Sequence, residues 1–579
     1  MMKDLEFRGR RIYTATVKQV IRRDKAPAFF CFVVALALFV PFHVYSQPAA
    51  VASAHPLATD AGIEVMQKGG NAFDAAIAVT ATLAVVEPYS SGIGGGGFWL
   101  LHINQDNRDV MIDGRERAPM AASRNMYLDE KNNVIPAASI NGPLSAGIPG
   151  VPAAIEHLAL KYGKLPLSVT LEAAIRHARA GFKTDQHYQR MAAFREKILN
   201  TSADAARIFL HNNKAPAPGT LIIQSDLADT LSLLASKGAR GFYQGELADK
   251  LVDSVVSHGG IWSKEDLAAY KITERAPVTG EYRGMKVVSA APPSSGGVAM
   301  IQMLKMLSGF DFDALSDGEQ IHLLAEVMRR AYRDRAEFLG DTDYVKVPVN
   351  RLTSRQYTNK LAGTIRMDEA TPSAELSPVV VDAAKATDTT HFSVVDSDGN
   401  RVAATLSINY PFGSCFVAEG TGVLLNDEMD DFSSKPGVPN AYGLVGAEAN
   451  AIEPGKRMLS SMTPTFLETK DRIAVLGTPG GSRIITMVLL ATLEFHNGGN
   501  AEDMVNRGRF HHQYLPDKIF FEPGVLTETL MKTLFELGHE TEVLDSTYGN
   551  MHAIVMDKKS RQLDAASDNR GSGSARVER

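Results

Sequence analysis

The sequence predicts an α/β fold. Residues 72–86 (AFDAAIAVTATLAVV) are apolar on nearly every side, which is typical of a helix inside a packed interior. Residues 150–367 carry mainly helical patterns. Residues 389–396 (TTHFSVVD) and 401–409 (RVAATLSIN) instead alternate in period two and are rich in β-branched side chains, which predicts two core strands. Buried helices and buried strands in one chain favour an α/β architecture.

The composition is that of an ordinary globular protein, with 45% hydrophobic and 22% charged residues. A chain of 579 residues usually forms three or four domains, although large α/β units exceed that size, so one or two interlocked domains are an alternative. The net charge of −6 and the pI near 6.2 provide no basic surface. We therefore expect no nucleic-acid partner.

The first 46 residues are predicted to be an export signal. Basic residues at 18–25 precede an apolar run at 26–44, and small residues that suit a signal peptidase lead to Ser46. A retained membrane anchor is the alternative, because the run approaches the lower limit of about 17 residues for a membrane span. In both cases we expect residues 47–579 to be periplasmic or secreted.

The chain has two cysteines, and Cys31 lies inside the predicted signal. The mature protein would keep Cys415 alone, so no intramolecular disulfide is expected even in an oxidising compartment. We expect Cys415 to be a small buried residue.

The first helices after the signal have clear ends. Residues 57–68 are predicted to form an amphipathic helix closed by Gly69-Gly70, and Asn71 is predicted to cap the helix at 72–86. The glycine run at 94–97 then leads into an apolar strand. Further helices are expected at residues 170–181, 224–237, 245–257 and 319–339.

Residues 369–387 (EATPSAELSPVVVDAAKAT) combine proline, serine, alanine and acidic residues without a sustained period. This composition predicts an exposed linker. The linker leads directly to the first of the two predicted core strands.

A Ser-Asp-Gly turn separates these two strands, and it fits a three-residue hairpin loop with glycine in the left-handed conformation. That loop pairs Asp396 with Asn400 and places Ser407 opposite Thr389. A two-residue Asp-Gly loop would place Ile408 there instead. We favour the first register, which gives Thr389 a hydroxyl neighbour.

Thr389 stands where the linker ends and the strand begins. A threonine here is explained by strand preference alone. A cut between Asp388 and Thr389 would, however, expose an α-amino group with a pKa of about 7.7–8.0 beside the hydroxyl. An N-terminal threonine carries its own general base, which activates a weak hydroxyl nucleophile.

Several motifs occur together in a specific order: HPLATDAGIEVMQKGGNAFDAAIA, IGGGGF, TTHFSVVD, MDDFSSKPGVPN, RMLSSMTPT, GTPGGSRIIT and RFHHQYLP. With them the chain resembles the γ-glutamyltransferase family of N-terminal nucleophile hydrolases over nearly its whole length after the signal. The resemblance implies a four-layer αββα sandwich with no cofactor or metal. It also implies self-cleavage into a large chain, 47–388, and a small chain, 389–579, which together form one interlocked αββα heterodimer.

The resemblance further implies that Thr389 carries the γ-glutamyl group of glutathione-like donors as an acyl-enzyme, and passes it to amino acids, peptides or water. Gly480 and Gly481 match the pair whose backbone N–H groups form the oxyanion hole. Ser407 stands where relatives commonly have a threonine whose hydroxyl bonds to the nucleophile.

The donor-binding roles also follow from the resemblance. Arg115 matches the arginine that holds the donor α-carboxylate, and Ser460 and Ser461 match the serine pair that supports it. Without the family, Arg115 would be taken as a surface ion-pair partner of Glu116 or Asp113, and the two serines as a turn.

Asn409, Glu428 and Asp431 match the residues that accept hydrogen bonds from the donor α-ammonium. Relatives often carry glutamine in place of Glu428. The neighbouring Asp430 is expected on a solvated face. Residues 435–454 resemble a lid over the donor pocket, with Tyr442 as the gating aromatic residue.

Two alternative functions remain from the sequence. One is an acylase for glutaryl-type amides such as modified β-lactams, on the same scaffold. The other is an uncleaved exported protein that binds γ-glutamyl peptides. The pair His511-His512 is expected to be structural, because adjacent residues do not share a helix face.

Overall fold

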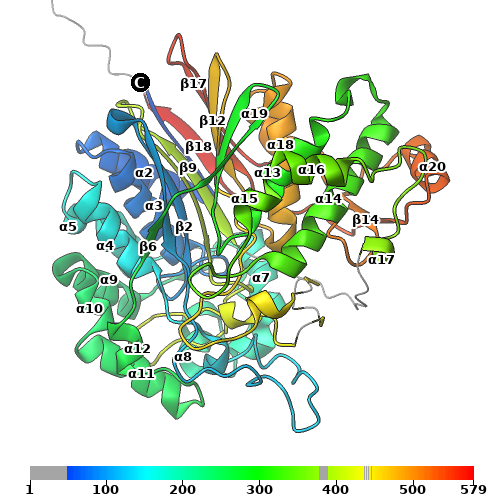
Figure 1. The fold of residues 1–579 in the computed structure, drawn as a ribbon. Helices are drawn as coiled ribbons and strands as arrows, with labels where there is room; N and C mark the ends of the chain where they lie inside the picture. The colour runs from blue at the N-terminus through cyan, green and yellow to red at the C-terminus, as the bar shows by residue number, and fades with distance from the viewer. Residues whose placement is uncertain are drawn as a thin grey trace, which may run out of the picture. The chain divides into compact units, whose positions relative to one another are not determined.

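Two antiparallel sheets lie face to face between two layers of helices in the computed structural model (Figure 1). The first sheet has the strand order β18 (Ser574–Glu578), β1 (Ala49–Ser53), β9 (Thr390–Val395), β10 (Arg401–Ser407), β2 (Gly96–Ile103), β3 (Arg108–Gly114) and β6 (Thr273–Arg275). The second has the order β17 (Leu563–Ser567), β16 (His552–Asp557), β12 (Arg472–Gly477), β11 (Thr465–Glu468), β8 (Met285–Ser289) and β7 (Val278–Tyr282).

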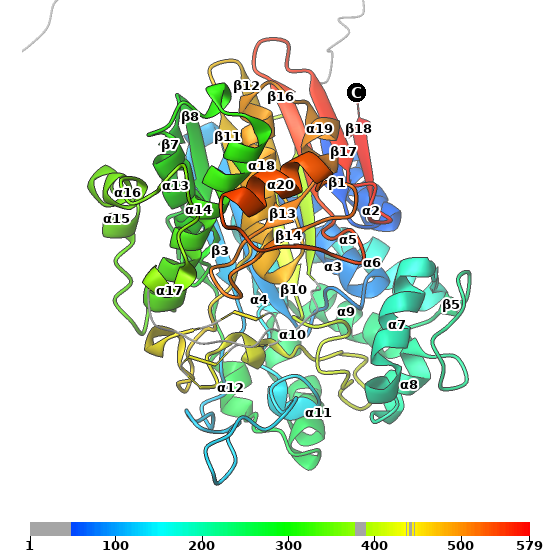
Figure 2. The same ribbon diagram turned by 90° about the vertical axis from the view of Figure 1, so that its right-hand side faces the viewer.

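Helices α2 (Pro56–Gln67) and α3 (Ala72–Val86) cover the first sheet, and α13 (Gly296–Leu307), α14 (Asp317–Phe338) and α18 (Ile484–His496) lie on the side of the second (Figure 1). Figure 2 looks onto this second helix layer. The four layers confirm the predicted αββα sandwich. The other α-helices are α4 (Val151–Lys161), α5 (Leu167–Thr170), α6 (Glu172–Ala180), α7 (Gln186–Leu199), α8 (Ala203–Phe209), α9 (Ser225–Lys237), α10 (Arg240–Tyr243), α11 (Glu246–Ser257), α12 (Lys264–Ala268), α15 (Val349–Leu352), α16 (Arg355–Ala362), α17 (Ser373–Leu376), α19 (Ala501–Asn506) and α20 (Glu528–Glu536).

The structure describes residues 48–376 and 389–578, except residues 436, 439, 441, 442 and 445. The predicted signal, Asp388 and Tyr442 lie outside the described residues. Within the described part, none of the helices has the length and apolar character needed to cross a membrane.

Period-two alternation distributes the first sheet between two cores. Phe98 and Leu100 of β2 face the second sheet, whereas Trp99 and Leu101 face the α3 side. All residues of α3 are buried, as its all-round apolar sequence predicts. Asn71 begins this helix with a capping box, in which its side chain accepts hydrogen bonds from Phe73 N and Asp74 N, so the predicted cap is confirmed.

The hairpin of β9 and β10 has the predicted three-residue loop. Asp396 N donates to Asn400 O over 3.1 Å, and Gly399 has a φ of 87°. Thr390 pairs with Leu406, so one further step along the same ladder places Ser407 opposite Thr389. The register predicted from the sequence is confirmed.

The beginning of the predicted exposed linker is exposed only in part, at residues 369, 372, 374 and 375. Ala370, Thr371 and Ser373 are buried. Ser373 N donates to Asp517 Oδ2 over 2.7 Å, and Thr371 N donates to Glu326 Oε1 over 3.0 Å. The prediction was wrong here because distant carboxylates satisfy this backbone, and local composition does not report such partners. Residues 377–388 lie outside the described residues.

Asp396 joins the hairpin to the first helix layer. Its carboxylate accepts hydrogen bonds from Ala72 N at the start of α3, from Asn400 N and from Asn400 Nδ2, at 2.9, 2.8 and 2.8 Å.

We expect Asp396→Ala to lower the free energy of unfolding by about 2 kcal/mol, because buried donors lose their acceptor. Thermal melts test this. The matched control is Asp398→Ala in the same turn, whose carboxylate is exposed; equal melting temperatures for the two variants would contradict the role of Asp396.

Candidate active site

One pocket contains most of the site residues predicted from the sequence. Its lining comprises Arg115, Thr389, Ser407, Asn409, Glu428, Asp431, Leu444, Ser460, Ser461, Met462, Gly481, Ser482 and Ile484. The space in this pocket that a water-sized sphere can occupy is about 20 Å³, enough for about one water molecule. Segments separated by more than 350 residues therefore meet at one point.

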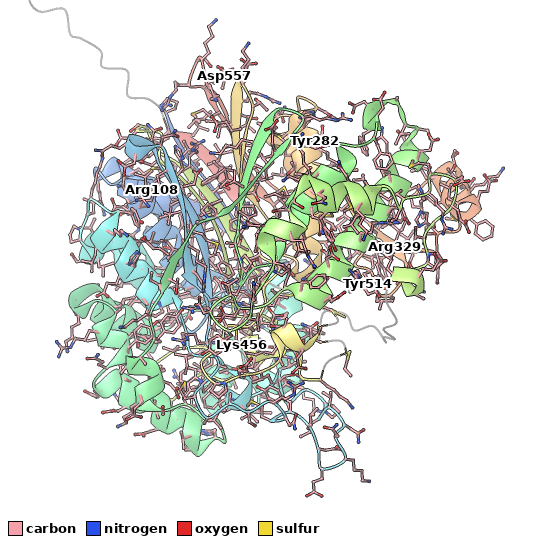
Figure 3. The ribbon with its side chains drawn as sticks, in the orientation of Figure 1. Arg108, Tyr282, Arg329, Lys456, Tyr514 and Asp557 are labelled. Carbon is pink, nitrogen blue, oxygen red and sulfur yellow. The ribbon has the colours of Figure 1, made fainter. Side chains whose placement is uncertain are left out.

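The pocket lies at one end of the two sheets. Figure 3 shows Arg108, Tyr282 and Asp557 near the opposite end, and Lys456 near the pocket end. Strand β3 runs from Arg108 toward the pocket, where Arg115 directly follows it.

Thr389 immediately precedes β9 and is buried. Its side chain belongs to the same face as those of His391 and Ser393, because alternate residues of a strand share a face. Ser393 Oγ on that face donates to Val475 O in the second sheet. Side chains on this face point between the two sheets. Thr389 is therefore the residue at which the intersheet space opens into the pocket.

Gly480 and Gly481 form the turn between β12 and α18. Their φ angles of 138° and 54° lie in the region that favours glycine. Gly481 begins a short 3-10 helix, Gly481–Arg483, which continues directly into α18. Backbone N–H groups at this helix start, with the positive end of the helix dipole, are suited to stabilise negative charge that develops beside Thr389.

Arg115 is completely buried, which excludes the surface ion pair. Its Nη1 donates to Glu428 Oε2 and its Nη2 to Asp431 Oδ2, both at 2.5 Å. Its Nε donates to Met458 O over 3.3 Å. The residues predicted for the donor carboxylate and for the donor ammonium are thus paired with each other. A zwitterion could take both sets of contacts by inserting between them.

Glu116 adds a third buried carboxylate, 3.5 Å from Arg115 Nη1. Burial, followed by the charge of Glu428, raises the pKa of Glu116 well above its usual range. Burial likewise raises the pKa of Glu428 to about 7 and raises that of Asp431. Sequence reasoning missed Glu116 as a buried neighbour of Arg115, because an alternating Arg-Glu-Arg sequence normally lies at the surface.

Asn409 has a φ of 76°, and its Nδ2 donates to Asp427 O over 3.0 Å. Its backbone N donates to Ser407 Oγ over 2.7 Å. Asp430, expected on a solvated face, is buried and accepts a hydrogen bond from Ser139 Oγ over 2.6 Å. The prediction for Asp430 was wrong because the segment 428–431 is a 3-10 turn inside the molecule.

Ser460 and Ser461 both present hydroxyl groups at the pocket. Met462 N donates to Ser460 Oγ and Arg335 Nη2 donates to Ser461 Oγ, each over 3.1 Å. A backbone N–H and a guanidinium can only donate hydrogen bonds, so each serine hydroxyl accepts one. Each hydroxyl can then donate its own proton to another acceptor. Two such protons in one pocket suit an anion.

The segment predicted to be a lid reaches the pocket through its described residues. Leu444 lines the pocket, and Asn440 Nδ2 donates to Asp431 Oδ1 over 3.4 Å. The gating role of Tyr442 lies outside the described residues and stays a prediction.

The His511-His512 pair and Cys415 are not among the residues that line the pocket. His511 Nδ1 lies 2.8 Å from Thr486 Oγ1, and His512 Nε2 lies 3.2 Å from Asp517 Oδ1. Each ring is therefore held by the protein, as expected for structural residues. Cys415 is buried, as expected, and burial raises the pKa of its thiol to about 12.

Comparison with known proteins gives the family. The family model described as gamma-glutamyltranspeptidase matches residues 58–577. The chain belongs to this family. It is 40% identical over 535 residues to a glutathione hydrolase proenzyme of Escherichia coli (strain K12), covering 91% of this chain and 92% of the relative. It is 44% identical over 496 residues to a glutathione hydrolase proenzyme of Pseudomonas sp. (strain A14), covering 85% and 86%.

The fold agrees with the family. The crystal structure of a cephalosporin acylase from Bacillus halodurans superposes with a TM-score of 0.79 at 27% identity, covering 92% of this chain and 96% of that one. This γ-glutamyltranspeptidase-family chain is therefore an enzyme of the N-terminal nucleophile hydrolase type, in which a threonine acts as nucleophile.

The raised pKa of Glu428 predicts a pH-dependent stability. The folded protein binds this proton more tightly than the unfolded chain, so ionisation lowers stability as the pH rises from about 4.5 to about 7. Glu428→Gln removes this loss. We expect the melting temperature of the variant relative to wild type to increase across that window, by on the order of a degree or two, and then to level off. Thermal melts from pH 4 to 9 measure this.

The control for that experiment is Glu265→Gln, at an exposed position of α12. Its melting temperature relative to wild type should stay constant with pH. A constant difference for Glu428→Gln as well would rule out the raised pKa.

Proposed function

We propose that this chain is an autoprocessing γ-glutamyltransferase and glutathione hydrolase that uses Thr389 as nucleophile. The observation that carries the proposal is that Thr389 lines one pocket together with Gly481, Arg115 and the Ser460-Ser461 pair. This pocket combines a nucleophile, backbone donors for an oxyanion, and both charges that a zwitterionic γ-glutamyl group requires. The E. coli and Pseudomonas relatives are both named glutathione hydrolase proenzyme, which supports glutathione as the donor.

Maturation begins when Thr389 Oγ attacks the carbonyl carbon of Asp388. The peptide bond is exchanged for an ester, and water then hydrolyses this ester to leave a carboxylate on Asp388 and an α-amino group on Thr389. The products are the large chain, 47–388, and the small chain, 389–579. They stay together as a heterodimer, because β9 and β10 of the small chain lie between β1 and β2 of the large chain.

In turnover the α-amino group of Thr389 takes the hydroxyl proton while Oγ attacks the γ-carbonyl of the donor. The N–H groups of Gly480 and Gly481 stabilise the oxyanion, and Ser407 orients the nucleophile from the neighbouring strand. Loss of the donor's amine leaves a γ-glutamyl ester on Thr389. An amino acid or peptide acceptor, or water, then releases the γ-glutamyl group.

On binding, the donor replaces the ion pairs that Arg115 forms with Glu428 and Asp431. Its α-carboxylate replaces Glu428 and Asp431 at the guanidinium of Arg115, and accepts the protons of Ser460 and Ser461. Its α-ammonium takes those two carboxylates together with Asn409. Leu444, and Tyr442 in the same lid, shield the ester from water and so favour transfer.

A glutaryl-type acylase is the second candidate, since the structurally similar Bacillus halodurans protein is a cephalosporin acylase. A glutaryl group has no ammonium. It would leave Glu428 and Asp431 buried without a cation once Arg115 turned to the carboxylate, which is unfavourable. The charge of the pocket therefore supports the amino-acid donor.

We propose that residues 1–46 export the precursor to the periplasm or the exterior, with a retained anchor as the alternative. N-terminal sequencing of the large chain decides between them. A start near residue 47 supports removal of the signal.

We expect Thr389→Ala to abolish both self-cleavage and turnover, because one hydroxyl performs both reactions. Denaturing electrophoresis should give a single band near full length, and release of glutamate from glutathione should be absent. Wild type processed in parallel should give two bands, the smaller one beginning at Thr389. Retention of either activity in the variant would refute the dual role.

We expect Arg115→Lys to mature normally but to bind the donor more weakly, because lysine keeps the charge and loses the planar fork. The KM for γ-glutamyl-p-nitroanilide should rise about tenfold or more, which corresponds to at least ~1.4 kcal/mol of binding. An unchanged KM would show that the carboxylate is bound elsewhere.

A further inference from the structure

Arg335 on α14 is a buried guanidinium of an unusual kind. Its side chain donates from Nε to Ser295 Oγ over 3.0 Å and from Nη2 to Ser461 Oγ over 3.1 Å. None of the ion pairs among the described residues includes Arg335, and both of its hydrogen-bond partners are hydroxyl groups. A buried cation that is hydrogen-bonded only to neutral hydroxyls is costly, because it gives up water without gaining an opposite charge.

The other arginines of α14 are all neutralised. Arg329, labelled in Figure 3, pairs with Asp517 at 2.5 Å. Arg330 pairs with Glu326 at 2.5 Å, and Arg333 pairs with Asp334 at 2.8 Å. Arg335 therefore differs from its three neighbours on one helix, because its printed hydrogen bonds go to hydroxyl groups and not to a carboxylate.

The contacts of Arg335 lead to the donor pocket by two routes. It holds Ser461 directly. It also holds Ser295, whose N and Oγ both donate to Ser460 O, at 2.8 and 2.7 Å. Because a guanidinium can only donate, Ser461 Oγ must accept from it. The proton of Ser461 is thereby left for another acceptor, and Ser461 is one of the residues that line the pocket.

The acidic groups around Arg115 favour a second cation near the donor carboxylate. Arg115 faces three buried carboxylates, those of Glu116, Glu428 and Asp431. Glu428 and Asp431 line the pocket with Arg115, so a donor brings its own carboxylate to a site that already holds acidic groups. Asp431 acts on the pKa of Arg335 by its charge, and Arg335 acts on that of Asp431, so the two groups lie within electrostatic reach of each other.

We propose that Arg335 is a second cationic determinant of the donor site, which positions Ser461 and supplies positive potential for the donor α-carboxylate. This inference rests on the proposed function, since it assumes a donor with that carboxylate. Arg335 acts through Ser461 and through its field, and is a positioning and specificity-determining residue. In this proposal Arg115 binds the donor carboxylate directly, and Arg335 adds positive potential near Ser460 and Ser461.

The test uses the processed enzyme with γ-glutamyl-p-nitroanilide as donor. We expect Arg335→Gln to mature and to raise the KM about tenfold or more, with kcat changed less than threefold, because the acylation chemistry at Thr389 is untouched. The Ki of L-glutamate as a competitive inhibitor should rise in parallel. Arg335→Lys should recover part of the lost affinity, since it restores charge.

The matched control is Arg333→Gln, on the same helix but paired with Asp334 and Glu337. It should leave KM and Ki within twofold of wild type. A KM for Arg335→Gln equal to wild type would overturn the inference. So would a fall in kcat with KM unchanged, or an Arg335→Lys variant as impaired as Arg335→Gln.

If Arg335→Gln does not mature, Arg335→Lys and Ser461→Ala with their double variant decide the matter. Coupled residues give a combined change in KM smaller than the product of the single changes. Independent changes would overturn the positioning role. Failure of wild type itself to cleave the γ-glutamyl anilide would refute the proposed function instead, so the two failures are distinct.

Discussion

The position of β9 inside the first sheet is the constraint on which the rest of the site depends. Hydrogen-bonded to β1 on one side and β10 on the other, this strand cannot slide by one residue without turning its core face outward. Thr389, which immediately precedes β9, is therefore directed between the sheets. The same pairing holds the two proposed chains together, because strands from both alternate in one sheet.

Buried charge is the second organising feature. Three buried carboxyl groups surround Arg115, and one arginine is hydrogen-bonded to the serine pair of the pocket. None of these groups stabilises the fold as an apolar side chain would, and together they are costly to bury. A zwitterion redistributes these charges into complementary pairs. In the proposed function, selectivity for an amino-acid donor follows from these pairings.

Local patterns predicted the elements well where one physical effect dominated. The all-round apolar stretch identified α3, Asn71 identified its start, and the Ser-Asp-Gly turn gave the register that brings Ser407 opposite Thr389. The predictions failed where a distant partner decided the environment. Asp430, Thr371 and Ser373 are buried because Ser139, Glu326 and Asp517 satisfy them from elsewhere in the chain.

The sequence by itself determined the α/β class, the caps, the hairpin register and, through the resemblance, the family and most of the pocket residues. These depend on neighbours within a few positions or on ordered motifs. Only the tertiary structure decided that Arg115 pairs with Glu428 and Asp431, that Glu116 is buried beside it, and that Arg335 bonds to Ser461. Burial and charge pairing arise between segments hundreds of residues apart, and no local pattern encodes which of them meet.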